Sequence, residues 1–524
     1  MSTEGSAYVI PTKVGIAGWH HRANGGPDLR RDDGRTEVPA CNALPTRSGP
    51  ASGAASSALD NETARRAASI LRAESRLDLA GGEGMVVLEP VAAAAATPRT
   101  LRKVVLASLI GTTIEWYDFF LYGTAAALVF NREFFPQTDP LTGAMLAFST
   151  YALGFIARPL GGLVFGHYGD RIGRKKLLMA SLMLMGSATV LIGCLPTFAQ
   201  VGVLAPVLLV MLRLLQGFAV GGEWGGAVLI VAEHGDAARR GFWASWPQAG
   251  VAAGNLLAAG VLAVMAAIQS EADFLAWGWR IPFLLSAALI GVGWWVRATV
   301  DESPAFDALR RQARAERAPA MEAIRTRPRA LAVGAGLRLA ENISYYIITA
   351  FSITYATEIV GLSRQTALNA LPLGAAVQFM AIPAFGALSD RIGRRPVYAI
   401  GALGTLVWAF AFFRLLDTGV TVNVLIAIVV GLVLHAAMYG PQAAFLAEMF
   451  PTRIRYSGVS LAYQVTSIAA GSLAPIIAIA ILRATGSALG VAQYVAITAA
   501  ITFAAALLAR ETRGKTFAEI DKET

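Results

Sequence analysis

Two acidic residues, Glu115 and Asp118, stand three positions apart inside a long apolar stretch of the sequence. Residues with this spacing share one face of a helix. Two carboxylates in a low-dielectric environment disfavour each other's ionisation, so at least one of them is expected to hold a proton reversibly. A proton-coupled carrier needs that property. The alternative is that both carboxylates hydrogen-bond to neighbouring helices and only hold the bundle together.

Arginine also occurs inside apolar stretches, where a charge is costly and is usually kept for pairing or function. The guanidinium group of Arg213 could form two hydrogen bonds with a carboxylate, either on a substrate or on Asp118 or Glu115. Arg213 could serve in both ways, if the binding of substrate or proton breaks its ion pair with Asp118 or Glu115. Glu223 follows Arg213 by nearly three helical turns, so we expect these two residues to face different partners.

Two further arginines have simpler interpretations. Arg338 and Glu341 are three residues apart and could neutralise each other. Arg158 precedes Pro159 close to the end of its stretch, and we interpret it as an arginine that extends toward the membrane surface or a gate. The residues expected to couple proton and substrate are Glu115, Asp118, Arg213, Glu223, Arg338 and Glu341.

Polar and aromatic side chains near these charges are candidates for lining a cavity, although packing is the commoner role of aromatic residues in membrane helices. The candidates are Tyr117, Gln216, Trp224, Gln248, Asn342, Tyr345, Tyr346 and Gln442. His435 could titrate near neutral pH, but we favour a hydrogen-bonded structural role. The glycines spaced by four from Gly217 to Gly225 predict close helix packing rather than ligand binding.

One loop pattern occurs twice, in residues 166–175 and in residues 386–395: Gly-x-x-x-Asp-Arg-x-Gly-Arg, followed by a basic residue. Asp170 and Asp390 each stand just before a predicted helix, where a carboxylate can accept hydrogen bonds from free N–H groups. The flanking arginines can pair with the aspartate. The duplication predicts two halves of similar structure.

These motifs resemble the major facilitator superfamily, and within it the metabolite:proton symporters, which include shikimate, alpha-ketoglutarate, citrate and proline/betaine transporters. The resemblance rests on residues 115–123, 213–226, 246–248 and 338–346. It implies the fold of that superfamily, proton-coupled transport, and paired loops that latch a cytoplasmic gate. The matching loop positions are Gly166, Asp170, Arg171, Gly173 and Arg174, and Gly386, Asp390, Arg391, Gly393 and Arg394.

Twelve apolar stretches of spanning length follow residue 98. A spanning helix needs about 20 residues, and such long stretches must be helical because lipid offers the backbone no hydrogen-bond partner. The predicted fold class is therefore an all-α membrane protein with twelve transmembrane helices. The stretches cover roughly residues 104–130, 142–166, 176–196, 202–232, 243–268, 279–299, 330–357, 366–388, 396–416, 422–446, 457–482 and 488–509.

Lysine and arginine lie mostly on one side of the predicted membrane, 26 of the 34 that follow residue 98. This excess marks the cytoplasmic side, so both termini are predicted to be cytoplasmic. Six spans return the chain to its starting side, and parallel halves enclose a site in mid-membrane. We expect a six-helix half at 99–299, a cytoplasmic linker at 300–329, a second half at 330–510 and a cytoplasmic tail at 511–524.

Residues 1–98 differ in composition, with 10 lysines and arginines, 11 acidic residues and no apolar run long enough to span a membrane. We predict that this segment is disordered. A second hypothesis is that translation starts at Met85, because the codons of residues 81–84 would be purine-rich, as a bacterial ribosome-binding site is. The alternative is an unstructured cytoplasmic tail.

A chain that is 55% apolar and 15% charged disfavours a soluble enzyme. Its two cysteines leave no set for a structural metal, and we expect no cofactor besides the proton gradient. The positive charge lies in loops and indicates no nucleic-acid partner. We expect a monomer that uses protons to take up a small organic acid or zwitterion through the bacterial inner membrane. The alternative is a drug/proton antiporter, but residues 247–254 lack the Gly-Pro-x-x-Gly-Gly pattern of such exporters.

Overall fold

A computed structural model of the chain describes residues 98–172, 174–221, 229, 231–233, 236–299 and 319–523. The predicted disordered segment and Met85 therefore lie outside the described residues, as do Glu223, Trp224 and Gly173. Residues 165–172 and 174–178 are described as helical backbone only, so the side chains of the first loop copy are outside the description too. These are Asp170, Arg171 and Arg174, with the backbone of Gly166 helical.

The helices before residue 300 form what we call the first group. Its spanning stretches break where the sequence turns polar or bends through a wider π-helical turn. The elements are α2 (Pro98–Ala125), η1 (Ala126–Phe130), α3 (Asn131–Glu133), α4 (Pro140–Ile172), α5 (Arg174–Gly193), α6 (Phe198–Val201), α7 (Leu204–Val220), η2 (Ala237–Arg239), α9 (Arg240–Ile268), α10 (Glu271–Asp273), η3 (Phe274–Gly278) and α11 (Arg280–Thr299).

The helices after residue 318 form the second group. Part of the predicted linker is helical, as is part of the predicted tail. The elements are α13 (Pro319–Thr326), α14 (Pro328–Tyr346), η4 (Ile347–Phe351), α15 (Ser352–Glu358), α16 (Arg364–Ile392), α17 (Arg394–Asp417), α18 (Thr421–Glu448), α19 (Arg455–Thr466), η5 (Ser467–Ser472), α20 (Ala474–Thr485), α21 (Ala488–Leu508) and α22 (Phe517–Glu523).

Long apolar helices dominate the described part of the chain. Eight of them are long and apolar enough to cross a membrane, and the bent pair Glu271–Gly278 and Arg280–Trp295 would make a ninth. Large apolar side chains such as Trp295 (63% exposed) and Met380 (65%) face outward. Exposed apolar surface of this extent is stable only in lipid. The chain is an integral membrane protein, and the count of twelve spans stays a prediction.

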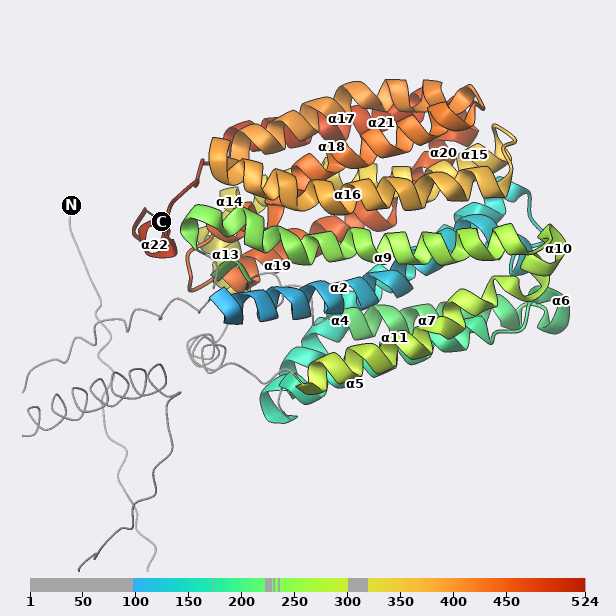
Figure 1. Cartoon of the computed structure of the whole chain (residues 1–524), viewed down its shortest axis with the longest axis horizontal. Helices are drawn as coiled ribbons and strands as arrows, with labels where there is room; N and C mark the ends of the chain where they lie inside the picture. The colour runs from blue at the N-terminus through green and yellow to red at the C-terminus, as the bar shows by residue number, and fades with distance from the viewer. Residues whose placement is uncertain are drawn as a thin grey trace, which may run out of the picture. The chain divides into compact units, whose positions relative to one another are not determined.

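The two groups pack along α9 and α16, which run side by side through the middle of Figure 1. Their backbones approach closely at Gly241 and Gly386, where a Cβ atom on either residue would crowd the carbonyl oxygen of the other. Within the first group, a Cβ at Gly217 would overlap the carbonyl oxygen of Gly154, so α7 and α4 touch backbone to backbone. The predicted packing role of Gly217 agrees with this contact.

One end of the bundle holds the start of α2 together with α13 and α22 (Figure 1). We call it the tail end. The opposite end holds α6, α10 and the start of α16. Between the two ends, buried aromatic and aliphatic residues of both groups form a single apolar core.

Candidate functional site

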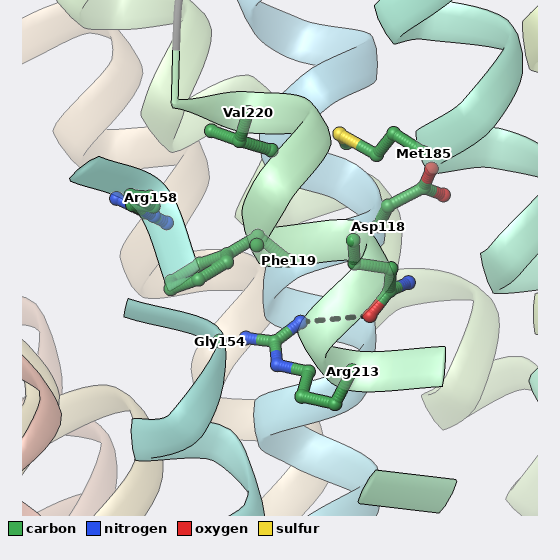
Figure 2. A pocket seen from close by; sticks show the side chains of 9 residues that line it. Asp118, Phe119, Gly154, Arg158, Met185, Arg213 and Val220 are labelled. Atoms are coloured by element: carbon green, nitrogen blue, oxygen red, sulfur yellow. Dashed lines mark hydrogen bonds between the residues drawn. The ribbon is translucent and has the colours of Figure 1, made fainter. Parts of the chain in front are cut away.

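A small cavity of about 10 Å³ lies in the first group between α2, α4, α5 and α7. That volume holds about one water molecule. Figure 2 shows Asp118, Phe119, Arg158 and Arg213 around it. The remaining lining residues are small or apolar except for one glutamine: Gly154, Met185, Gln216, Gly217 and Val220. The cavity therefore brings together three residues that the sequence singled out separately, Asp118, Arg213 and Gln216.

Arg213 is buried, with 2% of its surface exposed. Its Nη1 donates to Oε1 of Gln216 at 3.0 Å, and Gln216 in turn donates to the hydroxyl of Thr189 at 2.7 Å. The guanidinium carbon lies 4.3 Å from the ring centre of Tyr122 and 4.6 Å from that of Tyr151. Its Nε and Nη2 have no partner among the described residues.

Asp118 is buried as well and accepts a hydrogen bond of 2.6 Å from the hydroxyl of Ser286 on α11. It forms no ion pair with Arg213, although both side chains line the cavity. The sequence left open a buried ion pair between these residues, and that alternative is wrong for this structure. Glu115, one turn earlier on α2, is half-buried and does not line the cavity.

Arg158 is buried too, at 5% exposure, and it lines the same cavity. Its guanidinium carbon lies 4.3 Å from the ring centre of Phe155 and 4.8 Å from that of Phe119. The sequence-based interpretation of a side chain that extends to the membrane surface is therefore wrong. The aromatic residues one turn away on α4 and across on α2 are the signal that could have indicated a buried cation, because aromatic faces attract guanidinium groups.

A second polar cluster lies in the second group, and its arginine has a carboxylate partner, although the Nε atom of Arg338 has no hydrogen-bond partner among the described residues. Arg338 on α14 pairs with Glu341 at 2.6 Å, as its spacing predicted. Arg338 also donates to Gln442 (3.0 Å) and Ser467 (3.1 Å), and Gln442 donates to Glu341 at 3.1 Å. The charge of Arg338 is thus balanced within the cluster.

His435 on α18 extends this cluster toward α16. Its Nε2 lies 3.0 Å from Oε1 of Glu341, and its Nδ1 lies 2.7 Å from Nε2 of Gln378. An amide nitrogen only donates, so Nδ1 accepts and Nε2 carries the proton toward Glu341. The sequence predicted a hydrogen-bonded histidine but offered no sign of its partners, which lie far away along the chain.

The other cavity candidates divide into three kinds. Tyr117 links two helices, since its hydroxyl on α2 donates to the carbonyl oxygen of Pro282 on α11 at 2.8 Å. Gln248 on α9 is completely buried, and neither end of its amide has a partner among the described residues. Asn342 approaches Ser467 at 3.5 Å, beside the second cluster.

Tyr345 and Tyr346 lie between the two polar clusters. The ring of Tyr346 packs 6.0 Å from that of Tyr151 and 6.3 Å from that of Phe119, and the ring of Tyr345 packs 5.4 Å from that of Phe120. Tyr345 also lies 4.7 Å from the ring of His435. These aromatic contacts join α14 to α2 and α4 and close the space between the groups.

At the tail end, Asp390 of the second loop copy crosses between the groups. Its carboxylate accepts hydrogen bonds of 2.8 Å from the backbone N–H groups of Gly241 and Phe242, in the first turn of α9. Arg394 pairs with Asp390 at 2.6 Å, as predicted, whereas the predicted cap on the helix that follows is wrong. Glu511 caps that helix instead, by accepting from the N–H groups of Arg394 and Arg395 at 3.0 Å. Gly393, with φ of 109°, makes the turn between α16 and α17, and Arg391 is exposed beside it.

Two reciprocal ion pairs flank this contact. Arg240 of the first group pairs with Glu448 of the second at 2.8 Å, and Arg455 of the second pairs with Glu233 of the first at 3.1 Å. Each arginine also donates to a carbonyl oxygen eight residues earlier. The sequence shows this symmetry, because Ala232, Glu233 and Arg240 of the first group recur as Ala447, Glu448 and Arg455 in the second.

The helix α22 and the residues just before it contact both ion pairs. The ring of Phe517 lies between Arg240 and Arg455, 3.9 Å and 3.7 Å from their guanidinium carbons. The carbonyl oxygen of Lys515 accepts from Arg240 at 3.0 Å, and the hydroxyl of Thr512 donates to Glu448 at 2.5 Å. One segment therefore contacts charged residues of both groups, which sequence patterns did not indicate.

The opposite end is bridged as well. Arg132 reaches Glu358 at 3.5 Å, and Arg364 reaches Glu271 at 3.2 Å. Arg483 reaches Asp139 at 3.6 Å, where hydrogen bonds from Thr142 hold the pKa of the Asp139 carboxyl below its ordinary value. Among the described residues, contacts between the groups are therefore present at both ends of the bundle, and the cavity between the helices of the first group is very small. The described residues contain no cluster suited to a metal ion.

Comparison with known proteins identifies relatives over most of the chain. The Shikimate transporter of Escherichia coli K12 is 43% identical over 384 residues, which is 73% of this chain and 88% of that protein. The Inner membrane metabolite transport protein YhjE of the same strain is 40% identical over 78% of this chain and 94% of its own. The Proline/betaine transporter of that strain is 34% identical over 79% of this chain and 84% of its own.

Solved structures have the same fold. The proton:xylose symporter XylE bound to 6-bromo-6-deoxy-D-glucose superposes with a TM-score of 0.63 at 20% identity, covering 81% of this chain and 98% of that one. The inward open xylose transporter XylE from E. coli gives a TM-score of 0.61 at 20% identity, over 81% of this chain and 99% of its own. A family model for the Major Facilitator Superfamily matches residues 108–475, and again 340–522. The chain is a transporter that belongs to the major facilitator superfamily.

Proposed function

We propose that the protein is a symporter that uses the proton gradient to take up a small organic acid or zwitterion across the bacterial inner membrane. It works as a monomer, with twelve spans in two six-helix halves, residues 99–299 and 330–510. Residues 300–329 form the linker between them. The tail end faces the cytoplasm, and both termini are cytoplasmic. The relatives carry shikimate, proline and betaine in their names, which supports a small metabolite as substrate.

The observation that carries the proposal is the arrangement around Asp118. This carboxyl group lies at mid-helix in a buried cavity, where the neutral hydroxyl of Ser286 donates to it and two arginines face the same space. Neither arginine is locked to it by an ion pair, so Asp118 can gain or lose a proton without breaking one. A change of its charge alters what the two cations can bind, which is the linkage that coupling requires.

Alternating access follows from the contacts at the two ends. Opening the tail end breaks the Arg240–Glu448 and Arg455–Glu233 pairs, and opening the opposite end breaks Arg364–Glu271. The closed state has both sets intact. Proton and substrate load together from outside, and only the fully loaded or empty carrier passes through the closed state, because unpaired charge in the cavity is costly to enclose. The chain needs no cofactor beyond the gradient.

The test is uptake by proteoliposomes that contain the purified full-length protein. Asp118→Asn is expected to abolish uptake driven by an inward proton gradient while exchange of labelled for unlabelled substrate at equal pH persists. Glu519→Gln, a change of an exposed carboxyl on α22, is the matched control and should transport normally. Gradient-driven uptake by the Asp118→Asn protein would refute the proton role. Net efflux of a substrate, driven by the same inward proton gradient, would instead identify a drug/proton antiporter.

A further inference from the structure

We propose that the cavity of the first group binds the carboxylate of a substrate with net negative charge, through Arg158 and Arg213 together, and rejects zwitterions. This inference rests on the proposed transport function and narrows its substrate class. Arg158 becomes the residue that determines specificity.

Three guanidinium nitrogens at this cavity lack acceptors. They are Nε and Nη2 of Arg213 and Nε of Arg158, and all three are buried without a partner among the described residues. Buried polar atoms almost always have a partner, so each exception calls for an explanation. The Nε and Nη2 atoms of one guanidinium group form the fork that binds a carboxylate through two parallel hydrogen bonds. A substrate carboxylate supplies those missing acceptors.

The two polar clusters differ in whether their arginines have a carboxylate partner. In the second group, Glu341 neutralises Arg338 at 2.6 Å. In the first group, two arginines share a cavity with one carboxyl group, Asp118, and no described carboxylate pairs with either arginine. Buried cations without counter-charge are strongly unfavourable. A net negative ligand removes the excess positive charge when Asp118 is ionised, and the need for it grows when Asp118 takes up its proton.

The aromatic rings argue against a quaternary ammonium group. Such groups are recognised by open aromatic faces. Here the guanidinium carbons of Arg158 and Arg213 lie 4.8 Å and 4.9 Å from the centre of the same ring, that of Phe119. Tyr122 and Tyr151 are likewise engaged by Arg213. The ammonium group of a betaine would therefore meet two cations where it needs free rings.

The cavity has room for about one water molecule, so a substrate needs a wider space than this conformation provides. Phe119 stands between the two arginines in Figure 2 and belongs to α2, whereas Arg158 and Arg213 belong to α4 and α7. Small shifts of α2 relative to α4 and α7 would change the space between the guanidinium groups. The anion site is thus built at the contact of three helices.

The test compares shikimate, alpha-ketoglutarate and glycine betaine as probes on the purified full-length protein. Thermal unfolding in detergent measures binding without a gradient, and proteoliposomes measure uptake. We expect the two anions to raise the melting temperature and glycine betaine to leave it unchanged. Arg158→Gln should raise the KM for anions roughly tenfold to hundredfold, the range for loss of one charged hydrogen bond. Arg158→Lys should recover only part of this, because lysine lacks the planar fork.

Arg414→Gln removes an exposed arginine at the end of α17 and should transport like the unchanged protein. Stabilisation by glycine betaine but by neither anion would overturn the inference, and so would an unchanged KM in a folded Arg158→Gln protein. Anion binding that is indifferent to the proton gradient would refute symport yet leave the anion site standing. Proton-driven uptake of glycine betaine would overturn the anion site and leave symport standing.

Discussion

Neutralising Glu448 offers a sharp test of the contacts at the tail end. Its side chain is fully buried and accepts hydrogen bonds from Arg240, Arg394 and Thr512. Glu448→Gln keeps the shape and removes the charge. Removing one partner of a buried ion pair costs about 3–5 kcal/mol. Arg394 and Thr512 belong to the same group as Glu448, so their share of this cost is present whether the tail end is open or closed.

Only the bond from Arg240, at 2.8 Å, crosses between the groups and favours the closed state. A hydrogen bond to a charged group contributes about 1.5–3 kcal/mol. Since about 1.4 kcal/mol is a factor of ten, Glu448→Gln should shift the equilibrium toward the open tail end roughly tenfold to hundredfold. Glu233→Gln breaks the reciprocal pair with Arg455, but Glu233 is 19% exposed, so its effect should be smaller.

The assay uses a single cysteine at Ser245, which is completely buried on α9 next to Gly386, in a protein whose native cysteines are replaced by serine. Its rate of reaction with a membrane-permeant maleimide reports how often the tail end opens. The rate should increase roughly tenfold to hundredfold in Glu448→Gln, the factor derived above for loss of the Arg240 bond. Glu519→Gln should leave it unchanged. An unaltered rate in a folded Glu448→Gln protein would refute the reasoning.

Three further changes have defined outcomes. Phe517→Ala removes the ring between the two tail-end arginines and should raise the same labelling rate severalfold, each cation–π contact contributing about 0.5–2 kcal/mol. Gly217→Leu drives a side chain into the backbone of Gly154 and should lower the melting temperature and the yield of folded protein, which size-exclusion chromatography measures. Glu341→Gln leaves Arg338 buried without its counter-charge and should lower the free energy of unfolding by about 3–5 kcal/mol, measured by denaturant titration, whereas Glu341→Asp should lose less.

Interactions within one helix were accessible from the sequence. The spacing of Arg338 and Glu341 predicted a pair, and the structure has it. The apolar stretches predicted the helices, because the membrane imposes length and composition on them. The spacing of Gly217 indicated a close helix contact but not its partner, which is Gly154 on α4.

Interactions between distant helices were not accessible in this way. Arg158 was misinterpreted because its surroundings come from Phe119, which is remote in the chain. The cap that Asp390 provides was assigned to the wrong helix, since nothing near Asp390 in the sequence indicates the start of α9. The site's charge balance depends on such pairings, and one sequence records which charges exist but not which of them meet.

The contact between Asp390 and the start of α9 makes opening of the tail end measurable by hydrogen–deuterium exchange. The N–H groups of Gly241 and Phe242 belong to the first turn of a helix, where no carbonyl of that helix can reach them. Their protection from exchange with solvent deuterium therefore depends on a carboxylate from the other group. Opening of the tail end therefore exposes these two peptide hydrogens to water. Their exchange rate reports how often the tail end of an unlabelled, unmodified transporter opens.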